Sequence, residues 1–218
     1  KYTRIISVGA YRPTRIVDNA EICTRIDSTD EWILERSGIR ERRYAAPDES
    51  VIDMATNAAK IAIERAGIDP SELGVLLLAS CTYPYLTPSA ATQIAVRIGA
   101  TGIPATDISS ACAGFCYGVG MASDIIRSGN AKYALVIGAE KLTDWFDPSD
   151  RSLAFLFGDG AGAVRGGDAG GDSLARLDRD GEGGLEARTA RARHRLEAKR
   201  IGAPPGQSEA DEAAAVAG

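Results

Sequence analysis

The sequence predicts an α/β protein with a mixed but mostly parallel β-sheet covered by helices. Apolar runs without polar interruption occupy Val75–Ala79 and Tyr133–Ala139, as expected of strands that are buried on both faces. Segments with helical periodicity separate these strands along the chain, most clearly at Ser50–Ala66. Strands that alternate with helices imply a largely parallel sheet between two layers of helices.

Turn and cap residues punctuate the first part of the chain. We expect a strand, a short helix and an exposed or edge strand, over Arg4–Ala10, Asp30–Arg36 and Ile39–Tyr44. Ser28 or Thr29 can cap the short helix, and Gly38 ends it.

The longest predicted helix is Ser50–Ala66. Its apolar residues recur at spacings of three and four, and Gly67 follows at the position that ends a helix. After the buried strand Val75–Ala79, a further helix is predicted over Pro88–Ile98, with the proline near its first turn.

A cysteine at a corner between a strand and a helix is the most informative feature. The strand Ile103–Ile108 is followed by small residues around Cys112 and then by a helix. The positive end of a helix dipole and free backbone N–H groups favour the thiolate there, and the thiolate is the nucleophilic form. Cys112 is therefore the candidate nucleophile. The helix that follows is apolar on nearly all sides, which predicts that it is covered on both sides.

The other three cysteines are interpreted as structural. Most cysteines in soluble proteins are small, buried and inert, and this alternative applies to Cys112 as well. Cys116 lies one helical turn after Cys112, but two thiols without a nearby histidine or third cysteine make a poor zinc site, so no metal is expected. We expect Cys116 and Cys23 in the core and Cys81 at the end of a strand.

Glycines mark the end of the well-patterned region. After the buried strand Tyr133–Ala139, the segment Leu153–Val164 predicts a pair of strands around a turn at residues 158–160. The glycine-rich run from Gly158 to Gly162 lacks the lysine and Ser/Thr of a phosphate-binding loop and does not open a helix. We interpret it as a tight turn.

The composition changes abruptly after Val164. Residues 165–218 contain no aromatic residue, cysteine or methionine, and they are rich in glycine, alanine and arginine. Such a segment buries too little apolar surface to offset the entropy of ordering, so we expect a folded unit over 1–164 and a largely disordered tail over 165–218. Two explanations stay open: a shift of reading frame in a GC-rich gene, and a genuine disordered tail.

Charge and composition argue against several classes of function. A formal net charge of −5 argues against a dedicated nucleic-acid-binding protein. No apolar run is long enough for a membrane helix, and the N-terminus does not resemble a secretory signal. Four irregularly spaced cysteines do not suggest a disulfide framework, which favours a reducing cytoplasm.

Four segments resemble the β-ketoacyl-acyl carrier protein synthase III family, the thiolase-fold condensing enzymes that initiate fatty-acid synthesis. They read, in order, STDEWILERSGIRERR, DISSACAGFCYG, DPSDRS and FLFGDGAGAV. The resemblance covers about Tyr2–Val164. It implies a layered thiolase-like fold of which this chain matches the first half.

The resemblance implies an acyl transfer. Cys112 matches the nucleophile that takes the acyl group from acyl-CoA, and its own N–H would help to form the oxyanion hole. The acyl group then condenses with malonyl-acyl carrier protein, which loses carbon dioxide. Acyl-CoA and the acyl carrier protein are thus the expected substrates and partners, with no separate cofactor.

Three residues match the family's coenzyme A site. Trp32 and Arg151 correspond to the pair that encloses the adenine ring, and Arg36 corresponds to a contact with a coenzyme phosphate. Indole and guanidinium groups both offer flat stacking surfaces, which suits this role. From the residues alone, the alternatives are a core anchor for Trp32 and solvated surface charges for the two arginines.

The loop before the helix Pro88–Ile98 matches family positions that affect the size of the acyl pocket and the dimer interface. Thr87 matches a residue that narrows the acyl pocket when it is bulky, so a small side chain there suggests room for a longer or branched acyl group. The loop Tyr83–Thr87 matches one that crosses a dimer interface, and its apolar run fits a homodimer.

The chain departs from the family in its partner residues. Family members pair the cysteine with a histidine and an asparagine from the second half of the fold, whereas the only histidine here is His194, in the predicted tail. We therefore expect condensation to be lost or impaired. Two other interpretations stay open: a non-catalytic remnant that at most binds coenzyme A, and another thiolase-fold acyl-CoA synthase.

Overall fold

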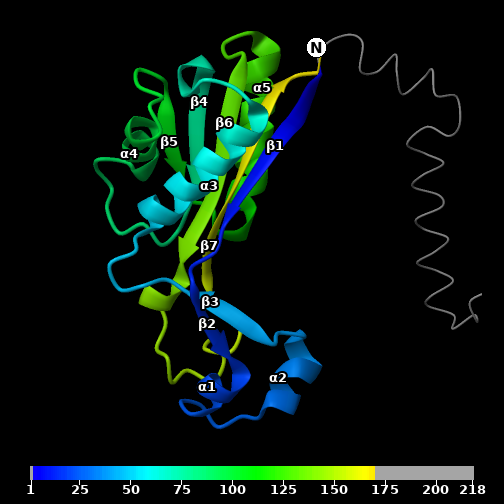
Figure 1. Ribbon diagram of the computed structural model, residues 1–218, viewed down its shortest axis with the longest axis vertical. Helices are drawn as coiled ribbons and strands as arrows, with labels where there is room; N and C mark the ends of the chain where they lie inside the picture. Colours follow the sequence, from blue (N-terminus) through cyan, green and yellow to red (C-terminus); the bar gives the residue numbers. More distant parts are fainter. Residues whose placement is uncertain (1, 170–218) are drawn as a thin grey trace, which may run out of the picture. The chain divides into compact units, whose positions relative to one another are not determined.

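The computed structural model describes residues 2–169, and Figure 1 shows how their elements are arranged. From residue 170 onward the predicted tail lies outside the described residues. The strands are β1 (Thr3–Tyr11), β2 (Arg15–Asp18), β3 (Glu41–Tyr44), β4 (Leu73–Ala79), β5 (Ala105–Ile108), β6 (Tyr133–Lys141) and β7 (Asp159–Asp168). The α-helices are α1 (Asn19–Cys23), α2 (Asp30–Ser37), α3 (Val51–Ala66), α4 (Ala90–Arg97) and α5 (Gly114–Ser128).

A sheet in the order β1-β7-β6-β4-β5 forms the body of the fold. β4 pairs in parallel with both β5 and β6, whereas β7 runs antiparallel between β6 and β1. The predicted mixed α/β sheet is thus confirmed, with the parallel pairing confined to β5, β4 and β6. This parallel part is the one that leads to Cys112.

Helices cover both faces of this sheet (Figure 1). Alternate residues of a strand point to opposite faces, and β4 follows this rule. Leu76 and Leu78 belong to the core shared with α3 and α4, while Val75 and Leu77 belong to the core shared with α5. Both faces of β4 are therefore buried, which explains its unbroken apolar run.

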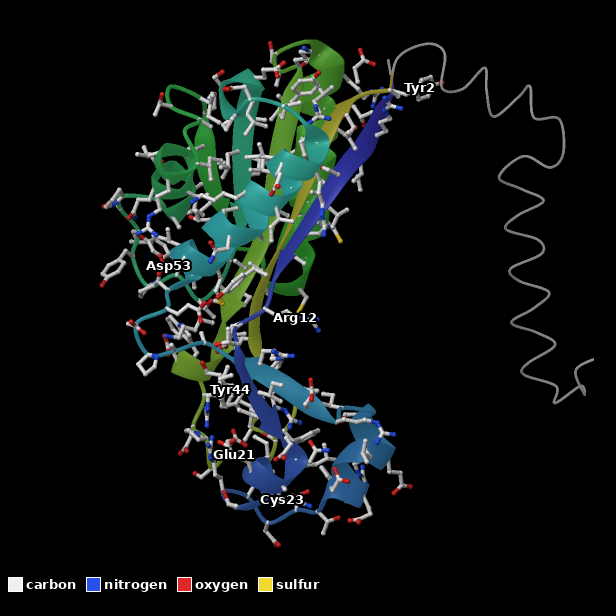
Figure 2. The ribbon with its side chains drawn as sticks, in the orientation of Figure 1. Tyr2, Arg12, Glu21, Cys23, Tyr44 and Asp53 are labelled. Carbon is white, nitrogen blue, oxygen red and sulfur yellow. The ribbon has the colours of Figure 1, made fainter. Side chains whose placement is uncertain are left out.

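A smaller core lies beside the main sheet, in the part of Figure 1 that contains β2, β3, α1 and α2. β2 and β3 pair antiparallel, and Val17, Ile22 and Ile33 are fully buried between them and the helices. Figure 2 places Cys23 and Tyr44 in this region. Cys23 is half-buried against this core, as expected, whereas the sequence did not predict β2 or α1.

Local capping signals fix the helix ends, and the predicted ends at Thr29, Gly38 and Gly67 are confirmed, whereas the cap at Ser50 was not predicted. Thr29 caps α2 by accepting a backbone hydrogen bond, and Gly38 ends the helix in the left-handed conformation. Ser50 and Asp53 form a capping box at the start of α3, which ends at Gly67. These interactions span only a few residues, so the sequence alone can reveal them.

The segment around Gly158 differs from its prediction. Residues 151–156 form turns instead of a strand, and β7 is one continuous strand from Asp159. The predicted strand pair and the tight turn at Gly158–Gly162 are therefore wrong. A Cβ at Gly158 would lie 2.9 Å from the carbonyl oxygen of Arg43, so close packing requires the glycine there.

β7 also continues beyond the expected boundary at Val164 and ends at Asp168. Its backbone pairs with β1 on one side and with β6 on the other. Glycine suits this position because a Cβ at Gly167 would lie 2.7 Å from the Ile6 side chain and 3.0 Å from Tyr133. The first residues assigned to the tail thus extend the strand, since ladder hydrogen bonds use the backbone alone.

Arg165, the first residue after that boundary, is buried in the sheet with 2% of its surface exposed. Its Nε and Nη1 have no hydrogen-bond partner among the described residues. The guanidinium lies 3.7 Å from the centre of the Tyr133 ring. Burial lowers the pKa of Arg165, because removal from water disfavours the charged form.

We expect Arg165→Met to raise the free energy of unfolding by about 1–4 kcal/mol, because an apolar side chain of similar length removes the cost of a buried charge. Urea denaturation followed by circular dichroism measures the change. Arg4→Met, at an exposed position of β1, is the control and should change stability by less than about 0.5 kcal/mol. A loss of stability in Arg165→Met would mean that the contact with Tyr133 outweighs the cost of burial.

The prediction that α5 is covered on both sides is wrong for the described part of the chain. Ala122 and Ile126 pack on the sheet, but Tyr117 and Met121 are 59% and 44% exposed. Cys116, expected in the core, is exposed as well. The apolar composition of α5 is real, but within residues 2–169 only one side of the helix has a partner.

Candidate active site

Cys112 lies at the junction that the sequence predicts. β5 ends at Ile108, Cys112 occupies a 3₁₀ turn, η2 (Ala111–Ala113), and α5 begins at Gly114. The thiol is exposed. No side chain caps η2 or α5, so the N–H groups of the first turn are not occupied by a capping residue.

The turn at Cys112 is strained. Within residues 2–169, Ala111 is the only non-glycine residue with a positive φ, 45°. This conformation costs about 1–3 kcal/mol and persists only where the surrounding structure enforces it. The strain accompanies the sharp change of direction that presents the next residue, Cys112, at the surface.

A cavity of about 640 Å³ opens beside Cys112. Its wall is mainly apolar and comes from the carboxyl ends of β4 and β6, the η2–α5 corner and the start of β7. The lining residues include Ala79, Cys81, Phe115, Leu142, Phe157 and Gly160. A volume of this size lies in the range of ligand pockets, and the apolar wall suits a hydrocarbon chain.

Glu140, near the end of β6, fixes the corner that follows β4. Its carboxylate accepts hydrogen bonds from the Cys81 N–H (2.9 Å), the Thr82 N–H (3.0 Å) and the Thr82 hydroxyl (2.5 Å). These bonds hold Cys81 in the wall of the cavity that Cys112 faces. Burial and the nearby Glu140 carboxylate raise the pKa of the Cys81 thiol.

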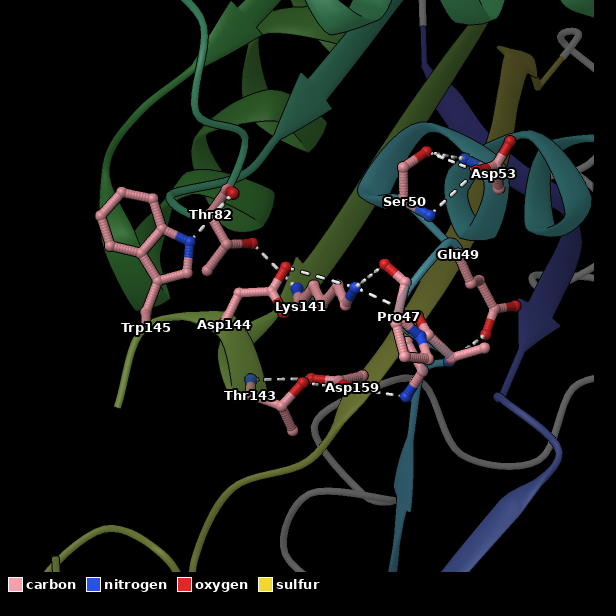
Figure 3. Close-up of polar contacts among 12 residues, drawn as sticks. Pro47, Glu49, Ser50, Asp53, Thr82, Lys141, Thr143, Asp144, Trp145 and Asp159 are labelled. Carbon is pink, nitrogen blue, oxygen red and sulfur yellow. Dashed lines mark hydrogen bonds and ion pairs between the residues drawn. The ribbon is translucent and has the colours of Figure 1, made fainter. Parts of the chain in front are cut away.

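Asp159 and Lys141 tie neighbouring loops to the sheet, as Figure 3 shows. Asp159 accepts hydrogen bonds from the Ala45 N–H (2.8 Å), the Thr143 N–H (3.1 Å) and the Thr143 hydroxyl (2.7 Å). The Lys141 ammonium is buried and donates to the Ala46 carbonyl oxygen (3.1 Å). Structural partners thus occupy these charged groups, and we assign neither of them an acid–base role.

The three predicted coenzyme A residues lie together. The guanidinium carbons of Arg36 and Arg151 are 4.8 Å and 4.7 Å from the centre of the Trp32 ring. Arg151 also donates from Nε to the Asp27 carbonyl oxygen (2.6 Å), and the Trp32 ring packs edge-on against Phe155. The structure brings the three side chains into one stack, and their role toward coenzyme A stays a prediction.

Thr87 does not line the cavity beside Cys112. It is exposed in the loop between β4 and α4, next to Leu86, which is 96% exposed. Within one copy of the described chain, Thr87 therefore does not narrow this cavity. Its predicted role requires that the loop enter a second copy of the chain, and it stays a prediction.

Two acidic residues at the site, Glu140 and Asp159, were not predicted from the sequence. Glu140 directly follows the apolar part of β6, and Asp159 lies in the glycine-rich run. A carboxylate next to a buried strand needs hydrogen-bond donors, and this is the one signal that could have identified Glu140. Within residues 2–169, no three His, Cys, Asp or Glu side chains gather into a metal site.

Comparison with curated proteins places this corner in a known family. The family model for 3-oxoacyl-[acyl-carrier-protein (ACP)] synthase III matches residues 106–174, which include Cys112 and run past Val164. The chain is 51% identical over 163 residues to beta-ketoacyl-[acyl-carrier-protein] synthase III of Kocuria rhizophila, covering 75% of this chain and 46% of the relative. It is 46% identical over 164 residues to the protein of that name from Streptomyces lividans, covering 75% of this chain and 48% of the relative. The chain thus spans about half the length of the curated relatives it matches.

Solved structures show the same likeness. The priming beta-ketosynthase from the R1128 polyketide biosynthetic pathway matches with a TM-score of 0.76 and 46% identity, over 78% of this chain and 51% of that chain. The 3-oxoacyl-[acyl-carrier-protein] synthase III of Aquifex aeolicus matches with a TM-score of 0.75 and 45% identity, over 77% of this chain and 54% of that chain. No helix among the described residues is long and apolar enough to cross a membrane. By its sequence and by the fold that carries Cys112, the matched part of this chain belongs to the β-ketoacyl-acyl carrier protein synthase III family.

Proposed function

We propose that this chain carries the acyl-accepting part of an initiating condensing enzyme, with Cys112 as the residue that is acylated. One observation carries the proposal: an exposed thiol at a helix start, beside a mainly apolar cavity of about 640 Å³. A helix start stabilises negative charge, and the cavity suits a hydrocarbon chain. Membership of the synthase III family supports this assignment.

In the proposed step, the Cys112 sulfur attacks the thioester carbonyl carbon of acyl-CoA. The carbonyl oxygen gains negative charge, and backbone N–H groups at η2, that of Cys112 among them, stabilise it. The tetrahedral intermediate then collapses, coenzyme A leaves, and the acyl group stays on Cys112. The step uses no bound cofactor, because the sulfur is itself the nucleophile.

The second step, condensation with malonyl-acyl carrier protein, needs groups beyond residues 2–169. This part of the sequence contains no histidine, because the one histidine is His194. The carboxylates that line the cavity beside Cys112, those of Glu140 and Asp159, are occupied by hydrogen bonds. We therefore propose that acylation proceeds and that decarboxylative condensation is lost or impaired in this chain.

Acyl-CoA, the acyl carrier protein and a second copy of the chain are the proposed partners. Tyr85 and Leu86 are 65% and 96% exposed, and together they give the loop after β4 an apolar tip. Adjacent exposed apolar side chains suit a surface that a second copy covers. The reducing cytoplasm is the proposed location, since Cys112 must stay reduced to act.

Mass spectrometry of the intact chain tests the proposal. The chain is incubated with acetyl-CoA, isobutyryl-CoA or octanoyl-CoA, and we expect one acyl group per chain on the tryptic peptide that contains Cys112. Addition of malonyl-acyl carrier protein should give no ketoacyl product. The absence of an adduct with every donor, in a chain with a folded circular dichroism spectrum, would refute acyl acceptance. Steady turnover would refute the loss of condensation.

We expect Trp32→Leu to weaken coenzyme A binding roughly 5- to 150-fold, because stacking of a base on an aromatic ring contributes about 1–3 kcal/mol. Titration calorimetry measures the affinity. Pantetheine, which lacks the adenine nucleotide, should bind the variant and the wild type equally. Trp145→Phe, in a different cavity, is the control and should bind coenzyme A normally. An equal loss of pantetheine binding would mean that Trp32 only anchors the fold.

A further inference from the structure

A second thiol lies in the wall of the cavity that Cys112 faces. We propose that Cys81 and Cys112 form a reversible disulfide when the protein meets a hydroperoxide, and that this bond blocks the Cys112 sulfur. The proposed acyl transfer does not use Cys81. The disulfide requires only the two thiols and an oxidant, so the inference does not depend on acyl transfer.

The sheet topology brings the two cysteines to one edge. β4 and β5 are parallel neighbours, with Ala79 opposite Ile108, and the Ser80 N–H donates to the Ile108 carbonyl oxygen (3.3 Å). The two strands therefore end side by side. From there the chain continues to Cys81 after β4 and to Cys112 after β5.

Cys81 lies beside the turn that holds Cys112. It lines the same cavity as Ala111, the residue before Cys112. Both cysteines are exposed, and both line the cavity of about 640 Å³. No side chain caps the turn η2, so the turn can move toward Cys81 without losing a capping hydrogen bond.

The surroundings give the two thiols different roles. Cys112 is exposed on the uncapped turn that leads into α5, so it is the thiol that attacks the peroxide. Partial removal of its sulfur from water and the nearby Glu140 carboxylate raise the pKa of Cys81, so this thiol reacts second.

The chemistry balances with hydrogen peroxide as the two-electron oxidant. The Cys112 thiolate attacks one peroxide oxygen, the O–O bond breaks, and Cys112 becomes a sulfenic acid while hydroxide leaves. The Cys81 thiol then attacks the sulfenic sulfur, and its proton passes to water. The second oxygen leaves as hydroxide. After proton uptake, two thiols and one peroxide have given one disulfide and two waters, and a reducing dithiol reverses the bond.

Peroxide treatment of the full chain tests the proposal by thiol counting and peptide mapping. We expect the four free thiols to fall to two and dithiothreitol to restore all four. A tryptic digest without reduction should contain one linked pair, residues 66–97 with residues 98–127. The first peptide contains Cys81, and the second contains both Cys112 and Cys116.

Cys116→Ser identifies the partner in the second peptide. It should form the same linked pair, because Cys116 is exposed but does not line the cavity. In Cys81→Ser, peroxide should oxidise Cys112 to a sulfinic acid that dithiothreitol does not recover. Each of three results would overturn the proposal. They are survival of all four thiols in peroxide, loss of thiols without a linked pair of peptides, and a link from Cys81 to Cys116 instead of Cys112. A chain that forms the link but accepts no acyl group refutes only the proposed function.

Discussion

Replacing Cys112 with alanine is expected to abolish acyl loading from every acyl-CoA. Removal of the nucleophile removes the covalent step itself, and the other exposed thiols lack its position. Cys116 lies one turn into α5, and Cys81 is held beside Glu140, which favours its protonated form. The acyl adduct in the intact mass spectrum should fall below detection.

Cys116→Ala is the matched control, because Cys116 is exposed on the same helix and should not affect loading. Coenzyme A binding separates recognition from chemistry. Cys112→Ala should keep the wild-type affinity, since the stack at Trp32 is unchanged. Loading that persists in Cys112→Ala but disappears in Cys81→Ala would assign the nucleophile to the corner after β4 and refute the role of Cys112.

The position of Cys112 can be predicted from the sequence because its determinants are local. An apolar strand, a corner of small residues and an apolar helix follow one another between Ile103 and Ser128. The strain at Ala111 and the cavity could not be predicted. The cavity is built from the ends of β4, β6 and β7, which lie far apart in the sequence.

Hydrogen bonds between distant residues account for the part of the site that the sequence does not reveal. Glu140 binds the N–H groups of Cys81 and Thr82, which lie 59 and 58 positions earlier, and Asp159 binds Ala45 at a separation of 114. Nothing in the sequence around either acid identifies these partners. Only the sheet topology, with β6 beside β4 and β7 beside β6, brings them together.

The sequence also does not show which structural role a glycine has. The run from Gly158 to Gly162 has the composition of a turn, yet β7 begins at Asp159. A Cβ at Gly158 would lie 2.9 Å from the Arg43 carbonyl oxygen, whereas one at Gly162 would meet nothing within 4 Å. A glycine in a strand often marks such an approach. Sequence alone does not distinguish a glycine that bends the chain from one that makes space.

Gly9 on β1 lets the helix α3 approach the strand closely, and a larger residue there should destabilise the fold. A Cβ at Gly9 would lie 2.1 Å from the carbonyl oxygen of Ala58 and 2.5 Å from the backbone nitrogen of Ala62. Both alanines are fully buried in α3, and the Ser7 hydroxyl donates to the Ala62 carbonyl oxygen (2.7 Å). α3 therefore rests directly on the backbone of β1 at Gly9.

Gly9→Ala is expected to lower the free energy of unfolding by about 3 kcal/mol or more, because the new methyl group must push α3 away from β1. The contact is with backbone, so no side-chain rotation can relieve it. Domains are stable by only about 5–15 kcal/mol, so this loss would remove a large part of the total. Urea denaturation followed by far-ultraviolet circular dichroism measures it.

Gly120→Ala is the matched control, because a Cβ at Gly120, on α5, meets nothing within 4 Å. Alanine is favoured over glycine inside a helix, so this variant should gain about 0.5–1 kcal/mol. The same substitution of alanine for glycine thus lowers the free energy of unfolding at Gly9 and raises it at Gly120. The comparison separates the effect of steric overlap from the effect of chain entropy. If Gly9→Ala unfolds at the wild-type urea concentration, α3 does not rest on β1 as described. The sheet that positions Cys112 would then need another source of support on that face.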